Sequence, residues 1–185
     1  MKNVYMDYSA TTPVKKEVLD AMLPYFSEHF GNPSSLYSIA QESKEALEKA
    51  RGQVASLIGA KANEVFFTAG GSEADNWALE GVADALKDKG NHIITTKIEH
   101  HAILHTAEYL EKHGIDVTYL DVDAEGRVNP EDVEKAITDK TVLISIMMVN
   151  NEVGTIEPIK EIAEIAHNHG ILLHTDAVQA LGNVP

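Results

Sequence analysis

Short apolar runs alternate with longer segments of helical periodicity along most of this sequence. Several of the runs are apolar at nearly every position, which is typical of strands that are covered on both faces. The runs expected to form strands are Val65–Thr68, His92–Thr96, Val117–Leu120, Val142–Met148 and Ile171–Thr175. Strand–helix–strand alternation at this spacing predicts an open parallel sheet with helices on both sides. Ligands of such sheets bind at the carboxyl ends of the strands, so the residues after each strand are the functional candidates.

The helices expected in the first 60 residues or so have recognisable ends. Thr12 is expected to cap a helix that has Pro13 at its first position. Pro24 should kink or interrupt this helix, because proline cannot donate a backbone hydrogen bond. A longer helix is expected from Ser35 to about Ile58, with Gly59 ending it.

The charge and the lack of cysteine exclude several functions. Lys and Arg number 15 and Asp and Glu 29, which gives a formal net charge of −14. So acidic a surface repels phosphodiester backbones and anionic lipids, and we expect neither a nucleic-acid nor a membrane partner. Without cysteine, the chain offers no disulfide, no thiolate metal ligand and no thiol nucleophile. No apolar run reaches membrane-span length and the first residues lack a signal-peptide core, so a cytoplasmic location is expected.

A glycine-containing turn from Thr68 to Ser72 is the first functional candidate. Gly70 and Gly71 would let the backbone approach a ligand, and the following helix would offer free N–H groups suited to a phosphate. In a purely structural interpretation, Ser72 and Asp75 form a capping box. The turn matches neither the dinucleotide glycine pattern nor the P-loop, so taken alone it favours the structural interpretation.

Two histidines, His100 and His101, follow the second expected strand directly. A histidine at this place could stack on a planar cofactor or transfer protons near neutral pH. A metal site formed by His101, His105 and Glu108 on one helix face is an alternative. The zincin pattern requires a glutamate after the first histidine, where Ala102 stands, so we expect no metal site.

The last candidates follow the fourth and fifth expected strands. Asn150 and Asn151 could orient a ligand through their amides, although asparagine is also an ordinary turn residue. Asp176 follows an apolar run, and a buried carboxylate needs a cationic partner. That partner is either a lysine or arginine of the chain or a cationic ligand, such as a protonated pyridine nitrogen. A structural ion pair or a helix cap explains this motif equally well when it is taken alone.

Together, and in this order, the motifs resemble those of the cysteine desulfurases of iron–sulfur cluster assembly, within the class V aminotransferase group of pyridoxal 5'-phosphate (PLP) enzymes. The similar segments extend over the whole chain. They are Tyr5–Pro13, Gly31–Ser35, Thr68–Ser72, Glu99–His100, Asn150–Thr155 and Thr175–Gln179. The sequence departs from the family at the glycine turn, usually Thr-Ser-Gly-Ala-Thr, and at Tyr37, where a histidine is common.

The resemblance implies an α/β fold: the three-layer parallel-sheet large domain of a fold-type I PLP-dependent transferase, incomplete at the C-terminus. Residues 1–15 would form an N-terminal segment associated with a small domain, and residues 16–185 would form part of the PLP-binding large domain. Gly71 and Ser72 would hold the cofactor phosphate. His100 would be the catalytic residue, stacked on the pyridine ring and assisting proton transfer.

The remaining site residues would contact the ring itself. By the same resemblance, Asp176 would pair with the ring nitrogen and keep it protonated. The residues implied beside the phenolic oxygen of the ring are Asn151 and Gln179.

As the resemblance implies, the complete enzyme would convert L-cysteine to L-alanine and leave a persulfide on a catalytic cysteine. It would be a homodimer and would pass sulfur to an acceptor scaffold protein. The Schiff-base lysine and the catalytic cysteine come later in the family, so this chain alone is expected to be inactive. The alternatives are another class V enzyme, such as a selenocysteine lyase or an aminotransferase, and a non-catalytic half or scaffold module of a split enzyme.

Overall fold

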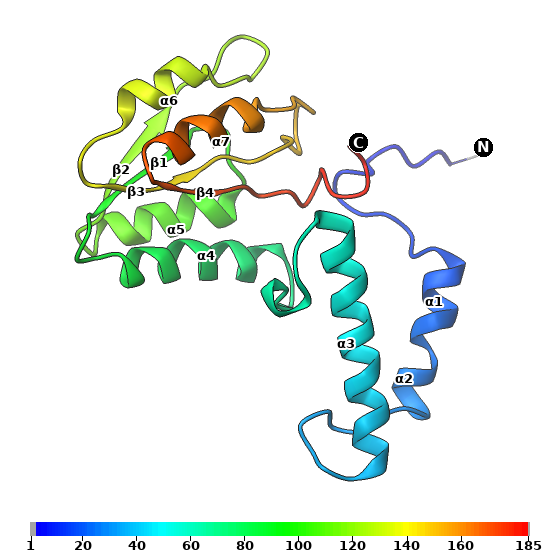
Figure 1. Ribbon diagram of the computed structural model, residues 1–185. Coiled ribbons are helices and arrows are strands. Elements are labelled where there is room, and N and C mark those ends of the chain that lie inside the picture. Colours follow the sequence, from blue (N-terminus) through cyan, green and yellow to red (C-terminus); the bar gives the residue numbers. More distant parts are fainter. Residues whose placement is uncertain (1–2, 185) are drawn as a thin grey trace. The chain divides into compact units, whose positions relative to one another are not determined.

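The computed structural model describes residues 3–184 of the chain (Figure 1). The chain divides into two compact units, Met1–Phe67 and Thr68–Pro185. The predicted ranges differ from this division: residues 1–15 would associate with a small domain, and residues 16–185 would form part of the large domain. The division into two units does not test these ranges, so they stay a prediction. Residues 1, 2 and 185 lie outside the described residues.

The first unit is helical. Its helices are α1 (Lys16–Met22), α2 (Pro24–Ser27), α3 (Ser38–Ile58) and the short 3₁₀ helix η1 (Ala62–Glu64). The interruption expected at Pro24 is confirmed, because α1 ends at Met22 and Pro24 begins α2. The cap expected at Thr12 is wrong: α1 begins four residues later, at Lys16. None of the α1 residues is buried, so no packing supports an additional turn at its amino end.

Helix α3 ends where its sequence predicts. Gly59 follows Ile58 in the left-handed conformation (φ 68°), and its N–H donates to the carbonyl of Ala55. The left-handed conformation is free of steric cost only for glycine, which explains this end. The helix begins at Ser38 rather than at Ser35, with extended backbone at Tyr37.

The strand expected at Val65–Thr68 is not formed. Val65 has extended backbone, but none of the described strands pairs with this segment. Its carbonyl instead accepts a hydrogen bond from the guanidinium of Arg51. An extended segment becomes a strand only when a neighbouring strand forms hydrogen bonds with its backbone. The local apolar pattern does not predict whether such a neighbour is present.

The second unit contains a four-stranded parallel sheet (Figure 1). The strands are β1 (His92–Thr96), β2 (Asp116–Leu120), β3 (Thr141–Ser145) and β4 (Leu172–His174). Their order is β2-β1-β3-β4, and every neighbouring pair is parallel. The α/β class and the parallel sheet are therefore confirmed, and the bounds of β1 are those predicted.

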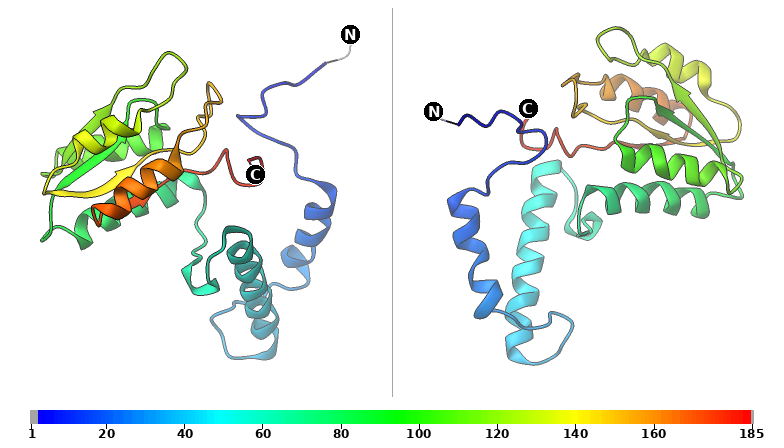
Figure 2. Two further views of the ribbon diagram at one scale, coloured as in Figure 1. Left: turned by 45° about the horizontal axis from the view of Figure 1, so that its top comes forward. Right: turned by 180° about the vertical axis from the view of Figure 1, so that it is seen from behind.

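Helices cover both faces of this sheet, which gives three layers (Figure 2). These helices are α4 (Gly71–Ala85), α5 (His101–Glu111), α6 (Pro130–Ala136) and α7 (Ile159–Asn168). Ile93 packs into one apolar cluster with residues of α4 and α5, whereas the next residue, Ile94, packs into another with residues of α6 and α7. Because successive strand side chains point to opposite faces, a continuous apolar run serves both clusters. Within the described chain, no helix is long and apolar enough to cross a membrane.

We expect Ile144→Ala to lower the free energy of unfolding by about 2–5 kcal/mol, because it leaves a cavity in a fully packed layer. Ile144 is completely buried in the cluster with α6 and α7. The matched control is Leu172→Ala on the neighbouring strand, where the leucine is 50% exposed and the loss should be about 1 kcal/mol or less. Urea unfolding followed by circular dichroism measures both losses. Equal losses would contradict a sheet covered on both faces.

Candidate functional site

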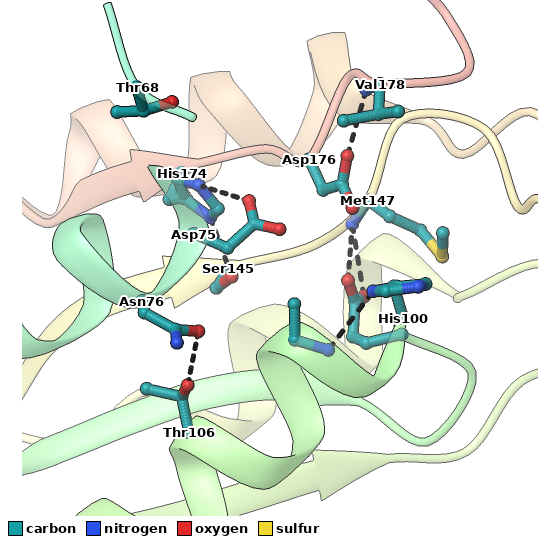
Figure 3. A network of polar contacts seen from close by, with 12 residues as sticks. Thr68, Asp75, Asn76, His100, Thr106, Ser145, Met147, His174, Asp176 and Val178 are labelled. Atoms are coloured by element: carbon teal, nitrogen blue, oxygen red, sulfur yellow. Dashed lines mark hydrogen bonds and ion pairs between the residues drawn. The ribbon is translucent and has the colours of Figure 1, made fainter. Parts of the chain in front are cut away.

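The carboxyl ends of β1, β3 and β4 bring the polar residues that follow them to one edge of the sheet (Figure 3). The pairing of β3 with β4 continues beyond the assigned strands. The N–H of Ile146 donates to the carbonyl of His174 (3.1 Å), and that of Met148 donates to the carbonyl of Asp176 (2.8 Å). The position of Asp176 is therefore fixed by backbone hydrogen bonds rather than by a loop.

Asp176 is buried, with 8% of its surface exposed. Its Oδ1 accepts a hydrogen bond from the N–H of Val178 at 2.9 Å, so the local cap weighed for this residue is present. In the part of the chain that the structure describes, no lysine or arginine forms an ion pair with this carboxylate. A cap supplies one hydrogen bond, which does not neutralise a buried charge.

The glycine turn lies against the segment that carries Asp176. Helix α4 begins at Gly71, and a Cβ added there would lie 2.8 Å from Cγ2 of Val178. Ser72 is exposed in the first turn of α4. The structure thus brings Gly71 and Ser72 to the same edge as Asp176.

The capping box expected between Ser72 and Asp75 is not formed, and no side chain caps α4. Asp75 instead turns into the protein and pairs with His174. The N–H of Ala69 is satisfied by the carboxylate of Glu73, at 2.5 Å. The tertiary partner of Asp75 therefore overrides the local pattern, and the amino end of α4 keeps N–H groups that no capping side chain occupies.

His100 immediately precedes α5, and its Nδ1 accepts a hydrogen bond from the N–H of Ala102 at 3.1 Å. The neutral ring therefore carries its proton on Nε2. His100 and Asn151 both line a cavity of about 570 Å³. The His101 and His105 rings stack with their centroids 5.2 Å apart, but among the described residues no group of three His, Cys, Asp or Glu side chains could hold a metal.

The two asparagines that follow β3 have different surroundings. Asn150 is buried and shapes the turn: its Nδ2 donates to the carbonyl of Ile98, and its Oδ1 accepts from two backbone N–H groups. Asn151 is half-buried and donates to Oε1 of Glu152 at 3.0 Å. Gln179 is half-buried in the turn that follows Asp176. The roles predicted for Asn151 and Gln179 stay predictions.

Glu99 belongs to the Glu99–His100 segment of the resemblance, but no role was predicted for its side chain. It is 5% exposed, and its carboxylate accepts from Oγ1 of Thr96 (2.6 Å) and from the N–H of Met147 (3.0 Å). These bonds join the end of β1 to the end of β3 directly before His100. Burial raises the pKa of Glu99 to about 7, with the charge of Asp176 adding to this rise and the two hydrogen bonds opposing it.

Asp75, His174 and Ser145 form a second polar group that sequence reasoning missed (Figure 3). The Oγ of Ser145 lies 2.9 Å from Nδ1 of His174, and the Nε2 of His174 lies 3.6 Å from Oδ1 of Asp75. Burial and, to a smaller extent, the charge of Asp176 raise the pKa of Asp75 to about 7. Burial lowers the pKa of His174, against an opposite effect of Asp176. An aspartate in the middle of a helix was the available signal for this group.

Asn76 joins the first turn of α4 to the first turn of α5. With its amide nitrogen facing the three neighbouring oxygens, it donates to the carbonyls of Ser72 and Ala102 at 3.0 Å each, and to Oγ1 of Thr106 at 2.7 Å. The turn that carries Gly71 and Ser72 is thereby tied to the one that follows His100. No local pattern predicts this link, because it depends on the packing of two helices.

Comparison with known proteins gives the same family from sequence and from structure. The aminotransferase class-V family model matches residues 4–185. A cysteine desulfurase IscS of Clostridium botulinum (strain Kyoto / Type A2) is 64% identical over 183 residues, which cover 99% of this chain and 46% of the relative. A cysteine desulfurase IscS of Methanosarcina thermophila is 60% identical, over 100% of this chain and 46% of the relative.

Solved structures agree with the sequence relatives. A NifS-like protein has a TM-score of 0.96 and 42% identity, over 100% of this chain and 51% of that one. The structure described as SspA in complex with cysteine has a TM-score of 0.92 and 44% identity, over 95% and 51%. The chain spans about half the length of the curated relatives it matches. It belongs to the aminotransferase class-V family, and within that family its sequence matches proteins named cysteine desulfurase.

Proposed function

We propose that this chain forms the phosphate-binding and ring-binding part of the PLP site in a cysteine desulfurase that supplies sulfur for iron–sulfur cluster assembly. The observation that carries the proposal is the buried carboxylate of Asp176, held by strand pairing beside the glycine turn at the start of α4. A carboxylate in this position favours a cationic ligand. Members of the family are PLP-dependent, and the pyridinium nitrogen of PLP is such a cation.

The residues present fit that cofactor. Helix α4 has 15 residues, and its amino end carries no side-chain cap, so backbone N–H groups at Gly71 and Ser72 are available to a phosphate. The space beside Gly71 is small enough that a Cβ would meet Val178. The phosphate end and the cationic end of the cofactor thus find complementary groups on one edge of the sheet.

When bound, PLP supplies the electron sink for chemistry at the α-carbon of an amino acid. The chain contributes orientation and charge. Asp176 would hold the proton on the ring nitrogen, because a charge-assisted hydrogen bond stabilises the cationic form. His100 would cover the ring and move a proton through Nε2, the nitrogen left free by the bond from Ala102. Asn151 and Gln179 would bind the phenolic oxygen of the ring through their amides.

The names of the relatives support the choice of substrate. Relatives in two organisms are named cysteine desulfurase, and one similar structure is described as a complex with cysteine. The chain itself contains no cysteine, so in this proposal the persulfide-forming thiol comes from the rest of the enzyme, as does the Schiff-base lysine. The proposal includes a cytoplasmic homodimer that passes sulfur to an acceptor protein, as the resemblance implies.

Asp176→Asn in the complete enzyme should keep the fold and still bind PLP, more weakly than the native protein, but lower kcat at saturating PLP on the order of a hundredfold or more, the scale of losing one charge-stabilising contact. The amide cannot hold the ring nitrogen protonated. Alanine and sulfide release from L-cysteine measures turnover, and the visible spectrum measures bound PLP. The matched control is Asp121→Asn, whose carboxylate is 82% exposed in a surface ion pair with Lys97.

Three results of that assay would count against the proposal. Normal turnover in Asp176→Asn would remove Asp176 from the site. A complete enzyme that binds PLP but releases no alanine from L-cysteine would favour another class V activity, such as transamination or selenocysteine cleavage. A complete enzyme that binds no PLP would favour a scaffold module.

Gly71→Ala should raise the dissociation constant of PLP about tenfold, which corresponds to about 1.4 kcal/mol. The added Cβ would lie 2.8 Å from Cγ2 of Val178 and would push apart the phosphate turn and the segment after Asp176. The double variant Gly71→Ala with Val178→Ala removes the contact and should recover most of the affinity. Equilibrium titration with PLP measures each constant. No recovery in the double variant would mean that Gly71 acts by some means other than this close approach.

A further inference from the structure

Asp75 has no part in the proposed function, yet it lies beside the carboxylate on which that function depends. It projects from α4 toward the end of β4, where Figure 3 shows its carboxylate between the His174 ring and Asp176. It is 5% exposed. A carboxyl group that is buried next to a second carboxyl group costs stability when both are ionised, so its retention calls for an explanation.

The side chain of Asp75 lies next to a polar connection, formed by His174 and Ser145, that reaches into the sheet. Nε2 of His174 lies 3.6 Å from Oδ1 of Asp75, and Nδ1 of the same ring lies 2.9 Å from Oγ of Ser145. Both ring nitrogens of His174 are therefore directed at partners. Ser145 lies on the interior strand β3 and is completely buried, so the connection ends in the core of the sheet.

The charged and titratable groups around Asp75 come from three elements. Helix α4 contributes Asp75 itself, the end of β4 contributes His174 and Asp176, and the turn after β1 contributes Glu99, which interacts electrostatically with Asp176. Strand β3 contributes the Ser145 hydroxyl, which does not titrate in this range. Burial and the charge of Asp176 raise the pKa of Asp75 to about 7. Its charge therefore changes near neutral pH.

We propose that Asp75, buried beside His174 and Asp176, is a positioning residue that reinforces Asp176: when it is ionised, it adds a second negative charge beside the carboxylate that binds the cationic ring. The inference rests on the proposed function for the identity of the ligand. Asp75 acts through Asp176, and the two carboxylates together favour a cation more strongly than Asp176 alone. Protonation of Asp75 removes this additional attraction.

The sign of the pH effect follows from linkage. A cation binds more tightly to the ionised form of Asp75, so the affinity for PLP gains a contribution as pH rises through about 7. Asp75→Asn has nearly the same shape and cannot ionise, so it lacks this contribution at every pH. The ratio of the two dissociation constants, variant over native, cancels the titration of the ring and the phosphate because both proteins bind the same ligand.

The test is equilibrium binding of PLP to the complete enzyme over a pH series. We expect the ratio of the dissociation constant of Asp75→Asn to that of the native protein to grow about fivefold between about pH 6 and about pH 8, the effect of a one-unit coupling centred near pH 7. The matched control is Glu157→Gln, which also replaces a buried carboxyl group with a raised pKa. Its ratio should change much less with pH, because the charge of Glu157 interacts with Glu99 and not with Asp75. A ratio for Asp75→Asn that does not change with pH would overturn the inference, because a purely structural role lowers affinity equally at every pH.

NMR of the cofactor-free complete enzyme, labelled at its histidines, gives a second readout that needs no PLP. The His174 ring signal, assigned from its loss in His174→Gln, should shift as Asp75 ionises, and Asp75→Asn should abolish this transition. His92 is an internal reference, because its ring nitrogens lie 2.7 Å and 2.9 Å from threonine hydroxyls. A His174 shift near pH 7 that keeps its full size in Asp75→Asn would overturn the coupling.

The outcomes separate this inference from the proposed function. If the complete enzyme bound no PLP at any pH, the proposed function would be wrong, and the ligand named in this inference would be wrong with it. If it bound PLP with a constant ratio for Asp75→Asn, only the inference would be wrong.

Discussion

Parallel strand pairing carries an acidic side chain to a place where water cannot solvate it. The backbone carbonyl of Asp176 accepts a hydrogen bond from the N–H of Met148, which follows β3, and the residue is 8% exposed at the edge of the sheet. Glu99 and Asp75 are buried at the same edge, and the charge of Asp176 raises the pKa of both. Carboxyl groups at this edge therefore repel one another when they are ionised, and a cationic ligand would reduce this repulsion. The ordered glycine turn beside it gives such a ligand a defined direction, with its anionic group at the amino end of α4.

The parallel sheet and the elements that bear the candidate residues could be predicted from the sequence because their signals are local. Strand β1 has the predicted bounds, and Gly59 ends α3 as expected. The continuous apolar runs serve two apolar clusters, since Ile93 and Ile94 face opposite layers. The order of the motifs along the chain then identified the family, which no single motif would have done.

The predictions that failed depend on contacts between distant parts of the chain. A capping box at Ser72 and Asp75 satisfies every local rule, but Asp75 has a histidine partner 99 residues further along the sequence, and that contact prevails. Val65 is extended, as its sequence suggests, but its carbonyl bonds to an arginine side chain rather than to a strand. The structural roles of Glu99 and Asn76 could not be predicted for the same reason. Glu99 joins the end of β1 to the end of β3, and Asn76 joins α4 to α5.

The amide of Asn76 has a consequence for how tightly a ligand can be held. It donates to the backbone carbonyls of Ser72 in the glycine turn and of Ala102 at the start of α5, so these two segments form one support. A ligand that contacts both does not have to immobilise them separately, and the entropy that is usually lost in ordering two loops on association is lost during folding instead. Part of the affinity at this edge therefore comes from the order that folding has already imposed on the two segments.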